Sequence, residues 1–287
     1  MDKLTQYLNA RWVLESEVHK VEFAYILSAL KNSNIDSIES YLSRDKIAAY
    51  ATADVNAVDQ YDLSEVNIPD NSVAVISVQG TLYSWKTFDI ENYIAQAINN
   101  PRIIAILLFV NTPGGMVHRI DIATSLILST PKPVNAYITG MCCSGGIWLV
   151  SACKNILAAS PLDVIGSIGV KTNYWSLKKY WEEMGIIDRD IYATDSSKKD
   201  YEVRELEDRN NDKPIIEELD FTNNLFQQTI SKNLNIPFDK NSDVFKGATF
   251  RANSALQYKL IHAIGSFEDA LKLTLANGLA SKSKTIY

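Results

Sequence analysis

Three short glycine-containing stretches, each beside an apolar strand-like run, constrain the fold of this chain more than any other feature. They are Asn111–Gly115, Met141–Gly146 and Gly166–Val170. Glycine closes strands at tight turns because it adopts backbone conformations that other residues avoid. The first stretch follows the apolar run 103–110, and the second places Ser144 directly before two glycines. Together they predict a group of turns at one edge of a sheet, with a serine at its centre.

Strand-like and helix-like segments alternate along the middle of the chain. β-Branched runs predict strands at 72–80, 103–110, 134–138 and 155–158. Apolar residues at helical spacing predict helices at 89–99, 120–128 and 144–152. This alternation indicates parallel strands joined by crossover helices, and therefore an α/β core of βαβ units. Ligands of such sheets bind at the carboxyl ends of the strands, where the glycine stretches fall.

The pattern changes at both ends of the chain. It predicts a helical N-terminal extension at 1–50, a small and polar linker at 51–71, a main domain at 72–275 and a polar tail at 276–287. Within the extension, the helical spacing includes Leu4, Tyr7 and Leu8. The last predicted helix covers 270–275.

A second part of the main domain carries most of its charge. Residues 188–193 predict a strand that leads toward Lys198 and Lys199. The stretch 201–213 is densely charged and predicts an exposed loop. Apolar residues at helical spacing predict a helix at 214–234.

The composition excludes several classes of protein. Hydrophobic residues make up 46% of the 287 residues, which supports a large core and excludes a disordered chain. The formal net charge is −6 at pH 7, so nucleic acid is not expected as a partner, because binding to phosphates needs a basic surface. No apolar run approaches the roughly 18 residues of a membrane span, and no secretory signal is visible. We therefore expect a soluble, intracellular protein without a membrane partner.

The cysteines and histidines do not form a metal-binding pattern. Cys142 and Cys143 are adjacent and poorly placed to bridge each other, and Cys153 lies in the same region. We expect three buried free thiols in a reducing compartment. The chain has no CxxC pair and its three histidines are scattered, so no metal site is expected.

Ser144 has two interpretations. A serine at the start of a helix is often an N-cap. The two following glycines favour a nucleophile, because each weakens a helix by roughly 1 kcal/mol relative to alanine and is kept where a backbone must approach another group closely. Gly114 and Gly115 either form an ordinary turn or supply a second amide for an oxyanion. A serine at a strand-to-helix turn beside such amides is the arrangement of acyl transfer.

A serine nucleophile needs a base, and the residues leave three candidates open. His118 lies three positions after Gly115, where a solvated residue at a helix start is the simpler interpretation. Lys198 and Lys199 follow the predicted strand, and a surface lysine pair is the simpler interpretation there. A lysine acts as a base only where burial beside the serine keeps it neutral.

Four motifs in order resemble one known family. Asn111–Gly115, Cys143–Gly146, Ser160–Pro161 and Gly166–Val170 are similar to the signal peptide peptidase A family of serine peptidases, which includes phage prohead proteases. The resemblance runs from about Ser72 to about Leu275, some two-thirds of the chain. It implies a ClpP/crotonase-like fold of repeated β-β-α and βαβ units, preceded here by the helical extension.

The resemblance also implies a mechanism. The family uses a Ser-Lys dyad, which maps to Ser144 and Lys199, with Lys198 as the runner-up because the segment before it departs from the family pattern. The oxyanion amides map to Gly115 and Gly145. No metal or cofactor is implied. Family members assemble into rings in which neighbouring subunits help complete the site, so we expect a homo-oligomer.

The implied function is a serine endopeptidase of the phage head-maturation type, acting on capsid or scaffold proteins. The lack of a membrane helix at the start of the sequence favours this type, located in the cytoplasm of a bacterial host cell and able to associate with proheads. Three alternatives stay open. They are a signal peptide peptidase A-like enzyme degrading peptides or signal-peptide remnants, a crotonase-like acyl-CoA enzyme, and an inactive binding module.

Overall fold

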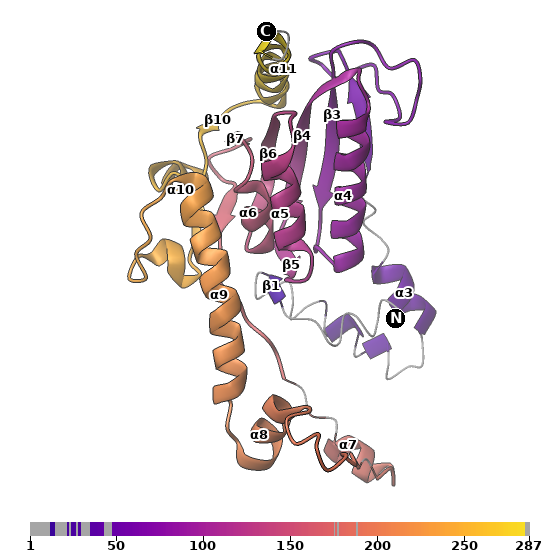
Figure 1. The fold of residues 1–287 in the computed structure, drawn as a ribbon, viewed down its shortest axis with the longest axis vertical. Helices are drawn as coiled ribbons and strands as arrows, with labels where there is room; N and C mark the ends of the chain where they lie inside the picture. The colour runs from indigo at the N-terminus through magenta and orange to yellow at the C-terminus, as the bar shows by residue number, and fades with distance from the viewer. Residues whose placement is uncertain are drawn as a thin grey trace.

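The computed structural model of the chain is built on one mixed, mostly parallel β-sheet with helices on both faces (Figure 1). It describes residues 12–14, 22, 24–26, 28–29, 35–42, 48–174, 176, 178–187 and 189–284. The strand order is β10-β7-β6-β4-β3-β2, with β8 paired to the end of β6 and β9 paired to β8. Strands β3, β4, β6, β7 and β10 run parallel, whereas β2 is antiparallel to β3. The predicted α/β class is confirmed.

The elements have the following bounds. The strands are β1 (Trp12–Leu14), β2 (Ala49–Thr52), β3 (Ser72–Gln79), β4 (Ile103–Thr112), β5 (Gly114–Met116), β6 (Val134–Cys143), β7 (Asn155–Ala158), β8 (Val164–Gly166), β9 (Thr249–Arg251) and β10 (Ala263–Ile264). The helices are α3 (Ile35–Leu42), α4 (Ser84–Asn99), α5 (Ile120–Ser129), α6 (Gly145–Val150), α7 (Lys178–Glu183), α8 (Tyr201–Arg209), α9 (Lys213–Leu234), the 3-10 helix η1 (Asp243–Lys246), α10 (Ala252–Gln257) and α11 (Phe267–Lys284).

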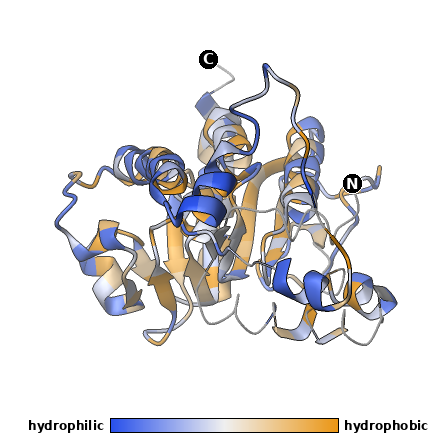
Figure 2. Cartoon of the chain, turned by 90° about the horizontal axis from the view of Figure 1, so that it is seen from below, coloured by the Kyte–Doolittle hydropathy of each residue, from blue (hydrophilic) through white to orange (hydrophobic). Residues whose placement is uncertain are grey.

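Alternation along the central strands divides the core into two layers. In β3, Val73 and Val75 face α11, whereas Ala74 and Ile76 belong to the core on the other face. That larger core includes buried residues of α4, α5 and α6, and Trp148 of α6 stacks on Phe226 of α9 at a centroid distance of 4.4 Å. Figure 2 shows mainly hydrophobic strands flanked by helices in which hydrophilic and hydrophobic residues alternate.

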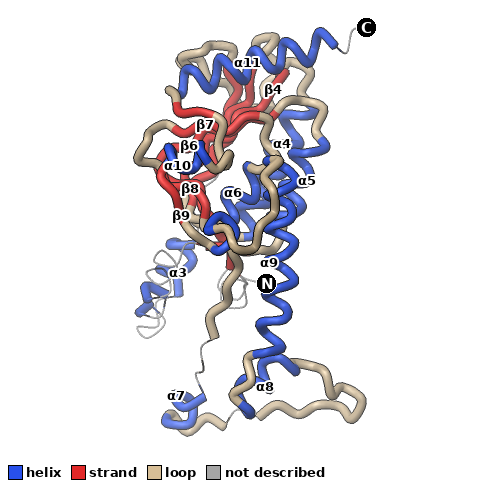
Figure 3. The backbone as a smooth tube through the Cα atoms, turned by 90° about the vertical axis from the view of Figure 1, so that its left-hand side faces the viewer, coloured by secondary structure: helices blue, strands red, loops and turns tan. Residues whose placement is uncertain are grey.

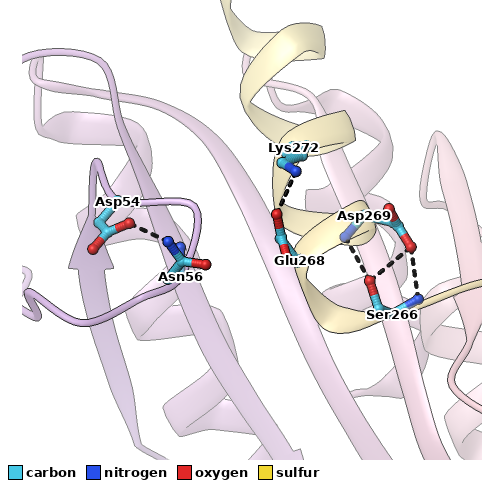
Figure 4. A network of polar contacts seen from close by, with 6 residues as sticks. All are labelled: Asp54, Asn56, Ser266, Glu268, Asp269 and Lys272. Atoms are coloured by element: carbon cyan, nitrogen blue, oxygen red, sulfur yellow. Dashed lines mark hydrogen bonds and ion pairs between the residues drawn. The ribbon is translucent and has the colours of Figure 1, made fainter.

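Helix α11 covers the second face of the sheet, and reciprocal hydrogen bonds fix its start (Figures 3 and 4). The Asp269 amide donates to Ser266 Oγ at 3.1 Å, and the Ser266 amide donates to Asp269 Oδ2 at 2.9 Å. This is a capping box, which satisfies amides that have no partner within the helix. Lys272 and Glu268 form an ion pair on the next turn. The Asn56 amide similarly donates to Asp54 Oδ1 in the loop after β2.

Several predicted boundaries differ from the structure because tertiary contacts override weak local patterns. Residues 49–52, divided between the predicted extension and linker, form β2, since pairing with β3 satisfies their backbone groups. The predicted polar tail is largely part of α11, which continues to Lys284 because Gly278 packs directly on Ile104 of β4. Trp12–Leu14 form strand β1 instead of helix. The predicted helix containing Leu4, Tyr7 and Leu8 lies outside the described residues.

The region after β8 projects away from the sheet, and we call residues 178–212 the arm. In Figures 1 and 3, α7 and α8 lie at the far end of α9 from the sheet. The predicted strand at 188–193 is wrong for its described residues 189–193, which have no regular structure, and Ile191 is 84% exposed. The predicted charged loop contains α8. Helix α9 has buried residues only from Thr222 onward, so its first turns project from the sheet together with the arm.

None of the helices in the described part of the chain is both long and apolar enough to cross a membrane.

We predict that Gly278→Val lowers the thermal unfolding temperature. A Cβ at this position would lie 2.8 Å from Ile104 Cγ1 and 3.0 Å from the Ile104 carbonyl oxygen. Overpacking of this kind costs about 1–3 kcal/mol, although valine forms helices better than glycine. Ala276→Val, on the exposed side of the same helix, is the matched control and should cost only the difference in helix propensity, about 0.7 kcal/mol or less. Equal unfolding temperatures for both variants would contradict the packing of α11.

We also predict that His262 makes the fold sensitive to acid. The Ile156 amide donates to His262 Nδ1 at 3.0 Å, and partial burial lowers the pKa of this imidazole. The unfolded state therefore binds more protons below the ordinary pKa, so stability is lost as pH falls through that range. His262→Asn keeps an acceptor and does not titrate, so its unfolding temperature should fall less than that of wild type between about pH 7.5 and about pH 5. Parallel loss in both proteins would show that His262 is not responsible.

Candidate active site

Ser144 occupies a strained turn between β6 and α6. Its backbone has φ 52° and ψ −115°, a conformation that non-glycine residues rarely adopt. Holding such a residue costs on the order of 1–3 kcal/mol. The Ser144 amide donates to the Gly166 carbonyl at 2.7 Å, which anchors the turn to β8. Since no side-chain cap bond is formed from Ser144 to α6, the simple N-cap interpretation does not explain this serine.

The second glycine after Ser144 allows α6 to lie against the end of β4. A Cβ on Gly146 would stand 2.6 Å from Thr112 Cγ2. Thr112 is paired with Cys142 in the parallel ladder between β4 and β6. Register therefore brings the turn after β4 beside the turn that carries Ser144. The Gly145 amide begins α6 directly after the serine, where an amide has no carbonyl acceptor within its helix.

Gly115 lies in backbone contact with Leu82, which follows β3. A Cβ on Gly115 would fall 1.9 Å from the Leu82 carbonyl oxygen, so no other residue fits without moving the backbone. The Leu82 amide donates to Gly114 O and the Met116 amide donates to Leu82 O, both at 2.8 Å. Because backbone groups alternate along a strand, the amide and carbonyl of Gly115 face the opposite side. On that side β1 pairs antiparallel with β5, with Val13 opposite Gly115.

Thr112 connects these turns. Its hydroxyl donates to the Gly80 carbonyl at 2.6 Å and accepts from the Gly114 amide at 3.1 Å. The carboxyl ends of β3, β4 and β6 thus meet at one place, as the positions of the glycine stretches predicted.

A cavity of about 600 Å³ lies beside Ser144. Its lining comprises Ser167–Lys171, Asn223 and Phe245–Thr249. The Ser144 hydroxyl donates to the carbonyl of Gly169, a lining residue, at 3.4 Å. Ser144 itself is 1% exposed, so a substrate carbonyl reaches its Oγ only after rearrangement of what covers it.

The neighbouring thiols are free and buried, as predicted. Burial raises the pKa of both Cys142 and Cys153, so these thiols stay protonated and are weak nucleophiles. In the described residues, no three histidine, cysteine or acidic side chains lie close enough together to hold a metal ion.

The candidate bases do not meet Ser144 within the described chain. Lys198 and Lys199 are exposed in the turn before α8 in the arm, and Lys198 Nζ lies 4.1 Å from the centroid of the Tyr201 ring. His118 is exposed in the turn before α5. The structure therefore brings together Ser144, the Gly114–Met116 strand and the cavity, but not a serine and a base.

Two features of the site were missed from the sequence. Asp163 is buried, and its carboxylate accepts from the amides of Gly140 and Ser160 at 2.8 and 2.9 Å, which holds the end of β6 against the Ser160–Pro161 motif. The position of Asp163, three residues after Ser160 of this motif, was the signal in the sequence that could have identified it. Strand β1 was missed because a three-residue strand has no recognisable period.

Comparison with known proteins gives one family and several distant relatives. The model of peptidase family S49 matches residues 127–278, which include Ser144. Protease 4 of Haemophilus influenzae is 24% identical over 285 residues, covering 93% of this chain and 43% of that protein. Capsid assembly protease C of Escherichia phage lambda is 28% identical over 243 residues, covering 74% of this chain and 53% of that protein. The chain thus spans about half of these relatives or less.

A putative signal peptide peptidase SppA of Enterococcus faecium is 24% identical, covering 77% of this chain and 67% of that protein. Among solved structures, an enoyl-CoA hydratase/isomerase family member aligns with a TM-score of 0.44 and 16% identity, covering 75% of this chain and 74% of that one.

We predict that Gly115→Ala disrupts the site and the fold around it. The added methyl group collides with the Leu82 backbone, which should lower the free energy of unfolding by about 3 kcal/mol or more in urea denaturation. Gly169→Ala is the control, because its Cβ would meet only Gly247 Cα at 3.7 Å, an ordinary contact. A Gly115→Ala protein as stable as Gly169→Ala would mean that β5 does not lie against Leu82.

Proposed function

The chain belongs to peptidase family S49, and from this we propose that it is a serine endopeptidase with Ser144 as its nucleophile. The observation that carries the proposal is the strained backbone of Ser144, a buried residue that follows β6 and bonds to Gly169 in the lining of the cavity. Strain of this kind is concentrated at functional sites. Burial and protonation make Cys142 and Cys153 poor rivals for the role.

The proposed reaction is acyl transfer through a Ser-Lys dyad. Ser144 Oγ attacks the carbonyl carbon of the scissile peptide while its proton passes to the neutral Nζ of Lys199. The amides of Gly115 and Gly145 stabilise the oxyanion. The lysine then gives the proton to the leaving amine, and water hydrolyses the acyl-enzyme. The cavity lined by Ser167–Lys171 would receive a substrate side chain next to the scissile bond.

We propose that Lys199 reaches Ser144 of a neighbouring subunit in a homo-oligomer. Lys199 precedes α8 in the arm, and α8 lies away from the sheet that carries Ser144 (Figure 1). The arm also exposes apolar side chains, with Ile187 at 90% and Phe221 of the adjoining α9 at 70%, which favours burial against another copy. Insertion beside a buried serine would provide the apolar surroundings that a neutral lysine needs.

The natural substrates we propose are capsid or scaffold proteins during phage head maturation. The support is the similarity to capsid assembly protease C of phage lambda across 74% of this chain. The similarity to putative signal peptide peptidase SppA supports a second candidate, the degradation of peptides. Incubation with cognate capsid or scaffold protein, compared with unrelated unfolded protein, separates the two by which is cut at defined sites.

Active-site variants test the dyad. With an unfolded test protein, Ser144→Ala and Lys199→Ala should each lower the cleavage rate at least about a thousandfold, since members of a catalytic unit act together. Lys198→Ala is the matched control and should cleave like wild type. Fragments are measured by intact-protein mass spectrometry. Cleavage by Ser144→Ala would show that Ser144 is not the nucleophile. An inactive Lys198→Ala protein together with an active Lys199→Ala protein would identify Lys198 as the base.

Mixing the two inactive proteins tests the neighbour's contribution. Ser144→Ala retains the lysine and Lys199→Ala retains the serine, so mixed oligomers should recover part of the activity. No recovery after subunit exchange, verified by native mass spectrometry, would place both groups in one chain.

A further inference from the structure

We propose that strand β1 is a built-in competitor of the substrate, because it occupies the edge of β5 on which an extended peptide would bind. This inference rests on the proposed peptidase function and concerns the regulation of that site. The observation behind it is the antiparallel pairing of Trp12, Val13 and Leu14 with Met116, Gly115 and Gly114, the last two being glycines of the candidate site.

The hydrogen bonds of β5 leave one backbone edge for a partner strand. Gly114 O and the Met116 amide are used by Leu82, and the Gly114 amide donates to Thr112 Oγ1. The amide and carbonyl of Gly115 are directed to the other edge, where Val13 lies opposite. The register thus directs the Gly115 amide toward β1, and an amide paired with that strand is not available to an oxyanion.

This edge fits an extended peptide. Addition of a strand to an exposed edge is a general mode of peptide recognition in which main-chain hydrogen bonds supply the affinity. An endopeptidase must hold its substrate extended, because the scissile bond must be presented to the nucleophile in one fixed geometry. Thr112 bonds to Gly114 of β5 and is the register partner of Cys142, two residues before Ser144. The Gly115 edge and the turn of Ser144 therefore lie at the same end of the sheet, which is where a substrate strand must bind.

Glu22, in the segment after β1, is hydrogen-bonded to the residues on both sides of Leu82, the residue that contacts Gly115. Glu22 is buried, and its carboxylate accepts from the hydroxyls of Thr81 at 2.5 Å and Tyr83 at 3.3 Å, on either side of Leu82. The apolar residues Ile26, Ala29, Ile38 and Leu42 form a separate core with Tyr83 and Met116. The N-terminal extension is therefore docked on the site by contacts independent of β1.

Docking in cis makes β1 a strong competitor even if its own affinity is low. A tethered strand acts at an effective concentration in the millimolar range, which a dilute substrate must overcome. Activation then consists of displacement of β1, and substrates that pair well with the β5 edge are favoured.

A binding experiment tests this without any need for turnover. The probe is a fluorescein-labelled peptide with the sequence of residues 9–17, and its Kd is measured by fluorescence anisotropy on the Ser144→Ala protein of residues 1–287. In the Ser144→Ala background, Val13→Pro removes the backbone amide that pairs with Gly115. This second substitution should tighten peptide binding about tenfold or more. Val13→Thr keeps the amide and the β-branched side chain, so it is the matched control and should bind like Ser144→Ala alone.

Equal Kd values for the proline and threonine variants, or no peptide binding by either, would overturn the proposal. A second variant avoids reliance on proline, since Thr81→Val removes a hydrogen bond to Glu22 and should tighten binding severalfold. With Ser144 present, Val13→Pro should lower KM about tenfold for a short peptide at little changed kcat. The binding measurement needs no catalysis, so the two proposals can fail separately. If wild type cleaves substrate normally but the variants do not bind the peptide as expected, only the role of β1 as a competitor is refuted. If the peptide binds as expected but wild type does not cleave, only the peptidase function is refuted.

Discussion

The contact between Gly115 and the backbone of Leu82 is the constraint on which the rest of the site depends. No Cβ fits between them, and two hydrogen bonds lock the turn after β3 against β5. This contact sets the direction of the Gly115 amide, and it places β5 beside the turns that end β4 and β6. The proposed role of the Gly115 amide requires this close approach of two backbone segments, because an amide can stabilise an oxyanion only from a fixed position.

Around this contact, the register of the sheet fixes where the turns of the candidate site lie relative to one another. Ser144 and Thr112 come from the ends of adjacent parallel strands, so their separation follows from the pairing of β4 with β6. The strain at Ser144 is supported by its hydrogen bond to Gly166 and by the large core below the sheet. Among the described residues of the arm, where the proposed base lies, only Glu205 is buried. The molecule thus joins a closely packed half-site to a projecting segment, an arrangement that assembly would complete.

The same edge connects chemistry and control. A glycine strand that can hold an extended substrate can also hold an extended piece of its own chain, since main-chain hydrogen bonds do not depend on side-chain identity. The extension docked through Glu22 brings such a piece to β5. Specificity and inhibition would then be two outcomes of one backbone geometry, and the balance between them is set by how firmly the extension is held.

The sequence by itself determined the α/β class, the central strands and the turn of Ser144, because these depend on local periodicity and on glycines with a steric purpose. The strand β2, the full length of α11 and the pairing of β1 with Gly115 were decided only by tertiary structure. Short strands and amphipathic ends carry little local signal, and their backbone groups are satisfied by residues distant in sequence. The place of Lys199 follows the same rule, since whether a lysine is buried beside a serine depends on which surfaces meet.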